Sequence, residues 1–172
     1  MLGIFPYDTG KNLGKAYNEA MSKLDGWVLI KDYDILILLP ETIRQIEHYT
    51  TIYPETGLFT CYTNRIANSE QLLNGMDNND SIRHHMKLAR QQQSELYTVT
   101  ELTKPVSGML MVIHTDTWNE IKFSEDLLCL GVDNDYHNRL KEAGKSVLRM
   151  NGIYVWHTYR LASGIKDKSH LV

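Results

Sequence analysis

Apolar positions along this chain fall into two patterns, and the first is a set of short continuous runs. These runs occur at residues 2–5, 27–30, 58–62, 109–113, 147–150 and 153–156. Short runs rich in branched and aromatic side chains predict strands. Because most of these runs are continuous rather than alternating, we expect strands that are covered on both faces of a sheet.

The second pattern places apolar residues at helical spacing between those runs. It predicts helices at residues 12–24, 41–49, 82–88 and 133–143. Strands and helices therefore alternate, which is typical of an α/β fold with a mostly parallel central sheet and helices on both faces. A length of 172 residues fits one domain, residues 1–172.

A polar segment at residues 66–81 interrupts this alternation. Compact domains rarely hold so long a loop unless it is mobile or functional, so we expect a poorly ordered lid bordering a cleft. His84 and His85 follow in the next predicted helix. Because adjacent residues on a helix do not face one another, we interpret this pair as part of a solvated face rather than as a metal site.

Composition narrows the class of protein. A formal net charge of −3 provides no basic field for nucleic acid. The two cysteines, Cys61 and Cys129, lie in apolar segments, the N-terminus does not resemble a signal peptide, and no apolar run approaches the roughly 20 residues that span a bilayer. We therefore expect a cytoplasmic protein without nucleic-acid binding or a transmembrane segment, with peripheral membrane attachment left open.

The most informative transition lies at residues 27–34, where an apolar run ends in Lys-Asp-Tyr-Asp. Side chains at i and i+2 of a strand share a face, so Asp32 and Asp34 can converge on one divalent cation at the carboxyl end of the strand. Another apolar run follows. Burying two carboxylates between apolar segments costs free energy unless a cation or hydrogen-bond donors compensate their charge. The alternative is a solvated, aspartate-rich turn.

A second pair, Asp133 and Asp135, falls in the first turn of a predicted helix. The simplest interpretation is that these carboxylates complement the helix dipole. Arg139 follows Asp135 by four residues, so it can hold that carboxylate and leave Asp133 free. A carboxylate that faces a cleft is a candidate general base.

His157 ends the last apolar run, among aromatic residues. A lone histidine in such a position is commonly a hydrogen-bonded edge residue. Together with the upstream aspartates, its neutral imidazole would instead complete the coordination of a cation such as Mn²⁺.

These segments occur in a characteristic order. Residues 12–20 precede the Asp32-Tyr33-Asp34 motif, residues 107–111 are followed by Trp118 and by Phe123-Ser124-Glu125, and residues 131–144 are followed by His157 and Arg160. In this order the chain resembles, from residue 12 to residue 160, the nucleotide-sugar glycosyltransferases of the A fold, specifically the family-two-like group. The fold that the resemblance implies is an abbreviated glycosyltransferase A type.

The resemblance implies transfer of a sugar from a nucleoside-diphosphate sugar, with a UDP-sugar favoured, to a hydroxyl of a glycan or other acceptor, with inversion favoured. It implies a Mn²⁺ or Mg²⁺ cofactor bound by Asp32, Asp34 and His157, and Asp133 as the base. The implied donor-binding residues are Tyr7, Asn12, Gly14, Lys15, Asn18, Asp32 and Arg160. The expected acceptor-binding residues are Gly108, Trp118 and Asn64, and homo-oligomerisation is left open.

Two departures from the family pattern leave alternatives open. Val132 stands where the family usually has an acidic residue. Residues 5–8 resemble the end of the family's first strand, yet they join almost directly to the helix at Asn12, so much of the nucleotide-binding half is missing. The alternatives are a compact glycosyltransferase, a site completed by a partner subunit, a noncatalytic module that binds a sugar or nucleotide-sugar, and a metal-dependent phosphate-ester hydrolase.

Overall fold

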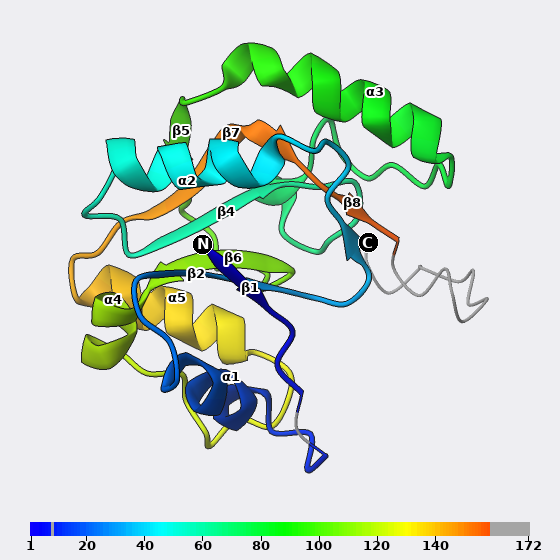
Figure 1. Cartoon of the computed structure of the whole chain (residues 1–172). Coiled ribbons are helices and arrows are strands. Elements are labelled where there is room, and N and C mark those ends of the chain that lie inside the picture. Colours follow the sequence, from blue (N-terminus) through cyan, green and yellow to red (C-terminus); the bar gives the residue numbers. More distant parts are fainter. Residues whose placement is uncertain (8, 159–172) are drawn as a thin grey trace.

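The computed structural model describes residues 1–7 and 9–158, and its strands form a twisted sheet in the order β1-β2-β6-β4-β7-β5 (Figure 1). The strands are β1 (Leu2–Ile4), β2 (Trp27–Lys31), β4 (Leu58–Tyr62), β5 (Val99–Glu101), β6 (Leu110–His114) and β7 (Val147–Tyr154). Strands β1, β2, β4 and β7 run in one direction, and β6 and β5 run in the other. The sheet is therefore mixed, with most of its strands sharing one direction.

Helices cover both faces of this sheet, as the sequence predicts (Figure 1). They are α1 (Leu13–Met21), α2 (Thr42–Ile52), α3 (Ile82–Gln92), α4 (Thr115–Glu120) and α5 (Val132–Glu142), with short 3-10 helices η1 (Ser69–Gln71) and η2 (Gln93–Glu95). Helices α1, α4 and α5 lie on one face, and α2 and α3 lie on the other (Figure 1). None of the helices in the described part of the chain combines the length and apolar character needed to cross a membrane.

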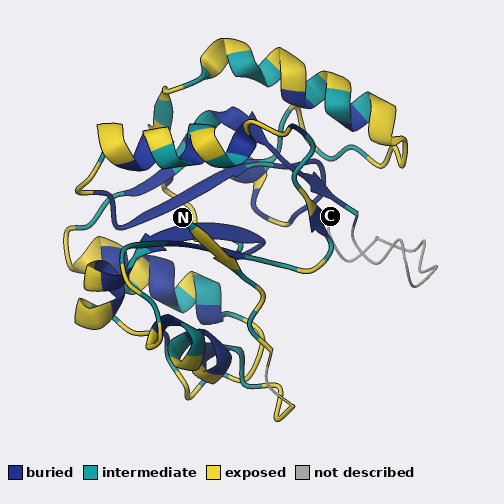
Figure 2. Ribbon diagram, viewed as in Figure 1, coloured by how far each residue is buried: buried dark blue, intermediate teal, exposed yellow. Residues whose placement is uncertain are grey.

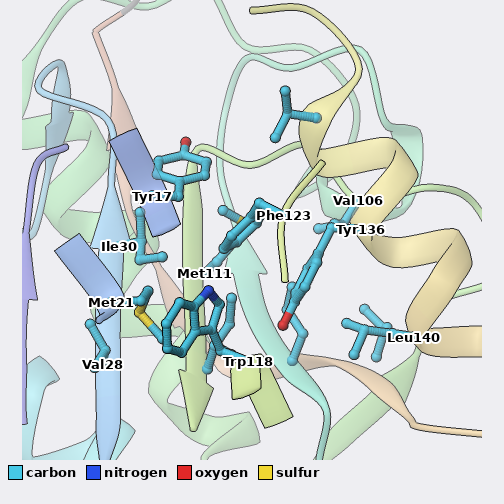
Figure 3. Packing of buried hydrophobic residues seen from close by; sticks show 14 of the residues in the cluster. Tyr17, Met21, Val28, Ile30, Val106, Met111, Trp118, Phe123, Tyr136 and Leu140 are labelled. Carbon is cyan, nitrogen blue, oxygen red and sulfur yellow. The ribbon is translucent and has the colours of Figure 1, made fainter. Parts of the chain in front are cut away.

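The apolar runs form strands because each run supplies side chains to two cores. In β2, Val28 and Ile30 pack with α1 and α5, whereas Leu29 packs on the opposite face with α2. Successive side chains of a strand alternate between faces, so a strand buried on both faces must be apolar throughout. Figure 2 shows this burial along the sheet, and Figure 3 shows the core under α1, α4 and α5.

A small second sheet joins the segment after β2 to the last described strand. Strands β3 (Ile35–Leu36) and β8 (Trp156–His157) are antiparallel, and Ile35 pairs with His157. Thr158 reinforces this pairing because both its backbone N–H and its hydroxyl donate to the carbonyl of Asp34, at 3.0 Å each, across 124 residues of sequence. The pairing brings His157 beside the Asp32-Tyr33-Asp34 motif.

Residues 66–81 differ from the expected lid. Ile66 belongs to a core cluster, and the fully buried Gln71 donates to the hydroxyl of Thr60 at 2.8 Å. Asn68 donates to the carbonyl of Pro105 at 2.7 Å. The expectation of a poorly ordered segment is therefore wrong for its first half, because these side chains make bonds that composition does not reveal.

The interpretation of His84 and His85 as a solvated pair is also wrong. His85 is fully buried, and its ring stacks on Trp156 with the ring centroids 4.9 Å apart. His84 contacts the carboxylate of Asp77 at 2.5 Å. The loop before α3 folds over the first turn of the helix, so a face that looks polar in sequence is covered by other polar groups.

Candidate functional site

The proposed site residues meet at one edge of the central sheet because of the strand directions. Strands β2, β4 and β7 end at this edge, while the antiparallel β6 begins there. Ligands in open α/β sheets gather at such an edge, beyond the carboxyl ends of the strands. An open pocket of about 560 Å³ lies here, which is within the usual range for a small-molecule site.

Asp32, Asp34 and His157 converge at this pocket and line it. One possible ligand atom from each lies within 4.8 Å of the others, and the carboxylate of Asp34 lies 3.5 Å from Nε2 of His157. The backbone explains the convergence: the chain turns after β2, with the N–H of Ile35 bonded to the carbonyl of Asp32, and β3 then pairs with β8. The structure thus brings together the three residues that the sequence indicated.

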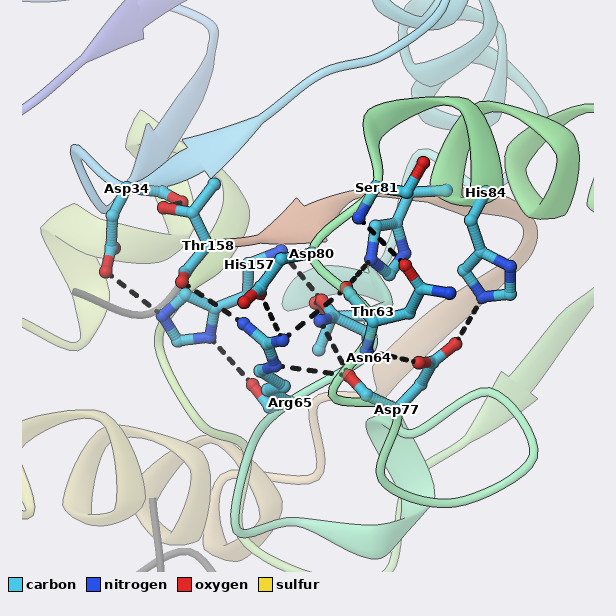
Figure 4. A network of polar contacts seen from close by, with 12 residues as sticks. Asp34, Thr63, Asn64, Arg65, Asp77, Asp80, Ser81, His84, His157 and Thr158 are labelled. Atoms are coloured by element: carbon cyan, nitrogen blue, oxygen red, sulfur yellow. Dashed lines mark hydrogen bonds and ion pairs between the residues drawn. The ribbon is translucent and has the colours of Figure 1, made fainter. Parts of the chain in front are cut away.

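Two neighbouring residues orient His157 (Figure 4). Its Nδ1 lies 2.7 Å from the carbonyl oxygen of Arg65, and its backbone N–H donates to Oδ1 of Asn64 at 2.9 Å. A carbonyl can only accept, so Nδ1 carries the proton and Nε2 faces Asp34. A backbone carbonyl behind the second ring nitrogen is a common way to orient a metal-binding histidine.

Asp32 has an environment that opposes its ionisation. Burial, with added repulsion from Asp34 and Asp133, raises the pKa of Asp32 from 3.8 to about 6, although His157 and Lys31 act in the opposite direction. The ammonium of Lys31 is bonded to the backbone carbonyls of Asp32 and Ile35. A divalent cation would relieve this repulsion, and two carboxylates with one neutral imidazole are a donor set that suits Mn²⁺ and is compatible with Mg²⁺. The residues present therefore fit the implied cofactor.

Asp133 lines the same pocket from the first turn of α5. Its Oδ2 accepts from the backbone N–H of Gly108 at 2.5 Å, and its Oδ1 accepts from the N–H of Asn134 at 3.0 Å. A Cβ on Gly108 would lie 3.0 Å from the Cβ of Asp133, so glycine permits this close approach. Arg139 holds Asp135 at 2.8 Å, as the sequence predicts, whereas Asp133 is bonded to backbone N–H groups rather than left free.

Tyr17 is a pocket residue that the sequence did not reveal. It lies on the buried face of α1, and its ring packs on Phe123 with the ring centroids 4.7 Å apart. Burial, followed by repulsion from Asp32 and Asp133, raises the pKa of the Tyr17 hydroxyl far above its usual range. The hydroxyl therefore stays protonated and can donate a hydrogen bond. Sequence periodicity alone counts Tyr17 as a core residue and cannot reveal this polar tip.

Four of the residues expected to bind the donor lie outside the pocket lining and shape or flank α1 instead. Asn12 caps the helix, and Asn18 accepts from the indole of Trp118 while donating to the carbonyl of Phe123. Gly14 lets α1 pack closely against the segment around Ser124, because a Cβ at position 14 would lie 1.9 Å from the carbonyl oxygen of Ser124. Lys15 is on the surface, 3.8 Å from Glu19. The contacts of Asn12, Gly14 and Asn18 cap α1 and pack it against residues 123–125, so these side chains do not form the pocket wall.

The expected acceptor residues divide in the same way. Gly108 lines the pocket, as expected. Trp118 is buried in the core, and Asn64 is fully buried between His157 and Asp77, so neither lines the pocket. Asn64 is instead a positioning residue for His157. Tyr7 is 83% exposed and does not line the pocket, and Arg160 lies outside the described residues.

Comparison with known proteins adds no assignment. No protein-family model matches the chain, and no curated protein matches it.

Proposed function

We propose that this protein is a metal-dependent glycosyltransferase that transfers a sugar from a nucleoside-diphosphate sugar to an acceptor hydroxyl. The observation that carries the proposal is the presence of two different carboxylate sets in one pocket. Asp32 and Asp34 stand with His157, whereas Asp133 is held separately by backbone N–H groups. The first set suits cation binding, and the second suits proton transfer.

On the donor side, Asp32, Asp34 and His157 would bind Mn²⁺ or Mg²⁺. When bound, the ion would neutralise the negative charge that develops on the departing nucleoside diphosphate. Tyr17 keeps its proton and lines the same pocket, so its hydroxyl can donate to an oxygen of the donor. The resemblance favours a UDP-sugar.

On the acceptor side, Asp133 takes the proton of the attacking hydroxyl. The N–H groups of Gly108 and Asn134 fix its carboxylate, which reduces the motion that would misplace a base. A second, smaller hollow adjoins this position, shares Ser107 and Asn134 with the pocket, and includes Asn68 and Lys104. These polar side chains suit a glycan or another hydroxyl-rich acceptor.

One structural observation favours a second candidate, a noncatalytic module that binds a sugar or nucleotide-sugar. The link between β1 and α1 comprises only residues 5–12, so this part of the chain offers few contacts to a nucleobase. A binding module would keep the cation-dependent affinity and have no turnover.

The experiment that separates the two candidates is release of nucleoside diphosphate from a panel of nucleotide-sugars, with candidate glycan acceptors, in Mn²⁺ or in EDTA. We expect metal-dependent release by the parent protein and its loss in Asp34→Ala. Asp116→Ala is the matched control, because Asp116 is an exposed carboxylate in α4 outside the pocket lining. Metal-dependent donor binding without release would favour the module, and the absence of both binding and release would overturn the proposal.

A further inference from the structure

A second group of possible metal ligands lies in the loop before α3 and in the first turn of that helix. Asp77, His84 and His85 each offer one ligand atom, and these atoms lie within 4.8 Å of one another. Figure 4 shows this region to one side of His157. Two imidazoles and a carboxylate form a donor set that binds transition cations, and four-coordinate Zn²⁺ sites commonly use such ligands.

Polar groups hold His85 at both of its ring nitrogens. Its Nδ1 lies 2.7 Å from the hydroxyl of Tyr154, and its Nε2 lies 2.5 Å from the carbonyl oxygen of Asn79. The carbonyl of Asn79 can only accept, so in the metal-free protein Nε2 carries the proton and donates to it, while Nδ1 accepts from the Tyr154 hydroxyl. A cation at Nε2 would take the place of that proton, and Nδ1 would then donate to the hydroxyl oxygen of Tyr154.

The side chains of Asp77 and His84 lie close to the ring of His85. Oδ2 of Asp77 lies 2.5 Å from Nε2 of His84, while its Oδ1 accepts from the N–H of Asn79 at 2.8 Å. The rings of His84 and His85 are 5.0 Å apart between centroids and nearly perpendicular. One ring nitrogen of each histidine lies within 4.8 Å of the other and of the Asp77 carboxylate, so these adjacent histidines can share a cation. The folded loop supplies further oxygen ligands between them.

The charge balance around the group is compatible with a cation. The fully buried guanidinium of Arg65 lies beside this group, where its Nε contacts the backbone of Asp77, and it pairs with the carboxylate of Asp80 at 2.5 Å. The Nε of Arg65 donates to the backbone carbonyl of Asp77, not to its carboxylate. Asp80 thus compensates Arg65, and the carboxylate of Asp77 faces His84.

We propose that Asp77, His84 and His85, with the carbonyl oxygen of Asn79 as a fourth ligand, bind a transition cation such as Zn²⁺ at a structural site separate from Asp32, Asp34 and His157. Such an ion would connect the loop that contains Asp77 and Asn79 to the first turn of α3. It would also support the neighbouring site, because the carbonyl of Asp77 accepts from Asn64 and Arg65, the two residues that orient His157. This inference does not depend on glycosyl transfer.

The test is Zn²⁺ binding to the tag-free full chain after EDTA treatment and dialysis, measured by calorimetry and by metal analysis of the dialysed complex. Asp34→Ala provides the background in which the first site is removed. In that background we expect one bound Zn²⁺ per chain and a thermal midpoint that rises with Zn²⁺ concentration. No bound Zn²⁺, or no rise in the midpoint, would overturn the proposal.

Variants of the second group identify its ligands. In the same background, His84→Gln should weaken Zn²⁺ binding at least about 100-fold, and Tyr154→Phe, which removes only the outer partner of His85, should weaken it about 10–100-fold. His84 and Asp77 are partly exposed, so these positions tolerate substitution better than buried His85. His48→Gln, on α2, is the matched histidine control and should bind Zn²⁺ as the background protein does. Unchanged affinity in His84→Gln would show that the contacts are a hydrogen-bonded network only.

Discussion

At Asp32, the unfavourable free energy of placing ionised carboxylates together in this site is most evident. Burial and two nearby carboxylates oppose its ionisation and raise its pKa to about 6. Such an environment opposes folding at neutral pH, where Asp32 is ionised, and perturbed carboxylates of this kind gather at functional sites. The unfavourable ionisation has a measurable consequence.

We expect the ionisation of Asp32 to destabilise the metal-free protein as the pH rises from about 4 to about 6. The folded-state pKa of Asp32 is above its ordinary value of 3.8, so its contribution to folding is present below pH 3.8 and is lost as the pH rises through about 6. The loss is on the order of 3 kcal/mol. Urea unfolding in EDTA should show that Asp32→Asn lacks this pH-dependent loss. An identical pH profile in the two proteins would contradict the assignment to Asp32.

Asp133 gives a second prediction at the scale of a single residue. Asp133→Asn should leave nucleotide binding nearly unchanged and lower turnover on the order of 10²–10⁴-fold, because the variant loses a general base but keeps the pocket shape. Asp135→Asn is the control, since Asp135 lies on the same helical turn and pairs with Arg139 outside the pocket lining. Steady-state rates of nucleoside diphosphate release measure both variants. Equal turnover in Asp133→Asn and the parent would eliminate Asp133 as the base.

At the scale of elements, the sequence predicts those strands whose positions are determined by burial of their own side chains. The strand at Leu58–Tyr62 matches its predicted bounds, and the strand from Trp27 is predicted because both of its faces are buried. The antiparallel direction of β6 between β2 and β4 depends on connections that periodicity does not encode. The pairing of β3 with β8 is equally nonlocal, yet it places His157 beside Asp34.

The polar residues of α1 show a further limit of sequence reasoning. Asn18 and Gly14 match a motif expected to bind the donor, but they pack α1 against residues 123–125. Similarly, Asn64 lies at the end of a strand on the site edge, and it is buried behind His157. Residue type and spacing indicate the region of a site. Which polar side chain faces the pocket is determined by contacts between elements that are distant in sequence.

The contact at Gly14 yields a prediction for α1 as an element. Gly14→Ala should destabilise the protein by about 3 kcal/mol, because the added Cβ would overlap the carbonyl of Ser124 and move α1 away from its neighbour. Gly3→Ala is the matched control, since a Cβ there meets Leu29 at an ordinary 3.9 Å. Denaturant unfolding compares the two variants. A cost for Gly14→Ala no greater than that for Gly3→Ala would contradict the close packing of α1.

At the scale of the whole molecule, the mixed sheet gathers the proposed metal-binding and base residues from distant parts of the chain at one edge. The turn after β2 supplies Asp32 and Asp34, the small sheet supplies His157, and α5 supplies Asp133. The loop before α3 supports His157 from behind through Asn64 and Arg65. The site is therefore a product of the complete fold.

The most direct test of the proposed function is calorimetric titration of the full chain with UDP in Mn²⁺ and in EDTA, repeated with Asp34→Ala. If Asp32, Asp34 and His157 hold a cation that binds the diphosphate, Mn²⁺ should tighten UDP binding by at least about tenfold, equivalent to about 1.4 kcal/mol. Asp34→Ala should remove that gain. Equal affinity for UDP with and without Mn²⁺ in the parent protein would contradict a metal-dependent nucleotide-sugar site.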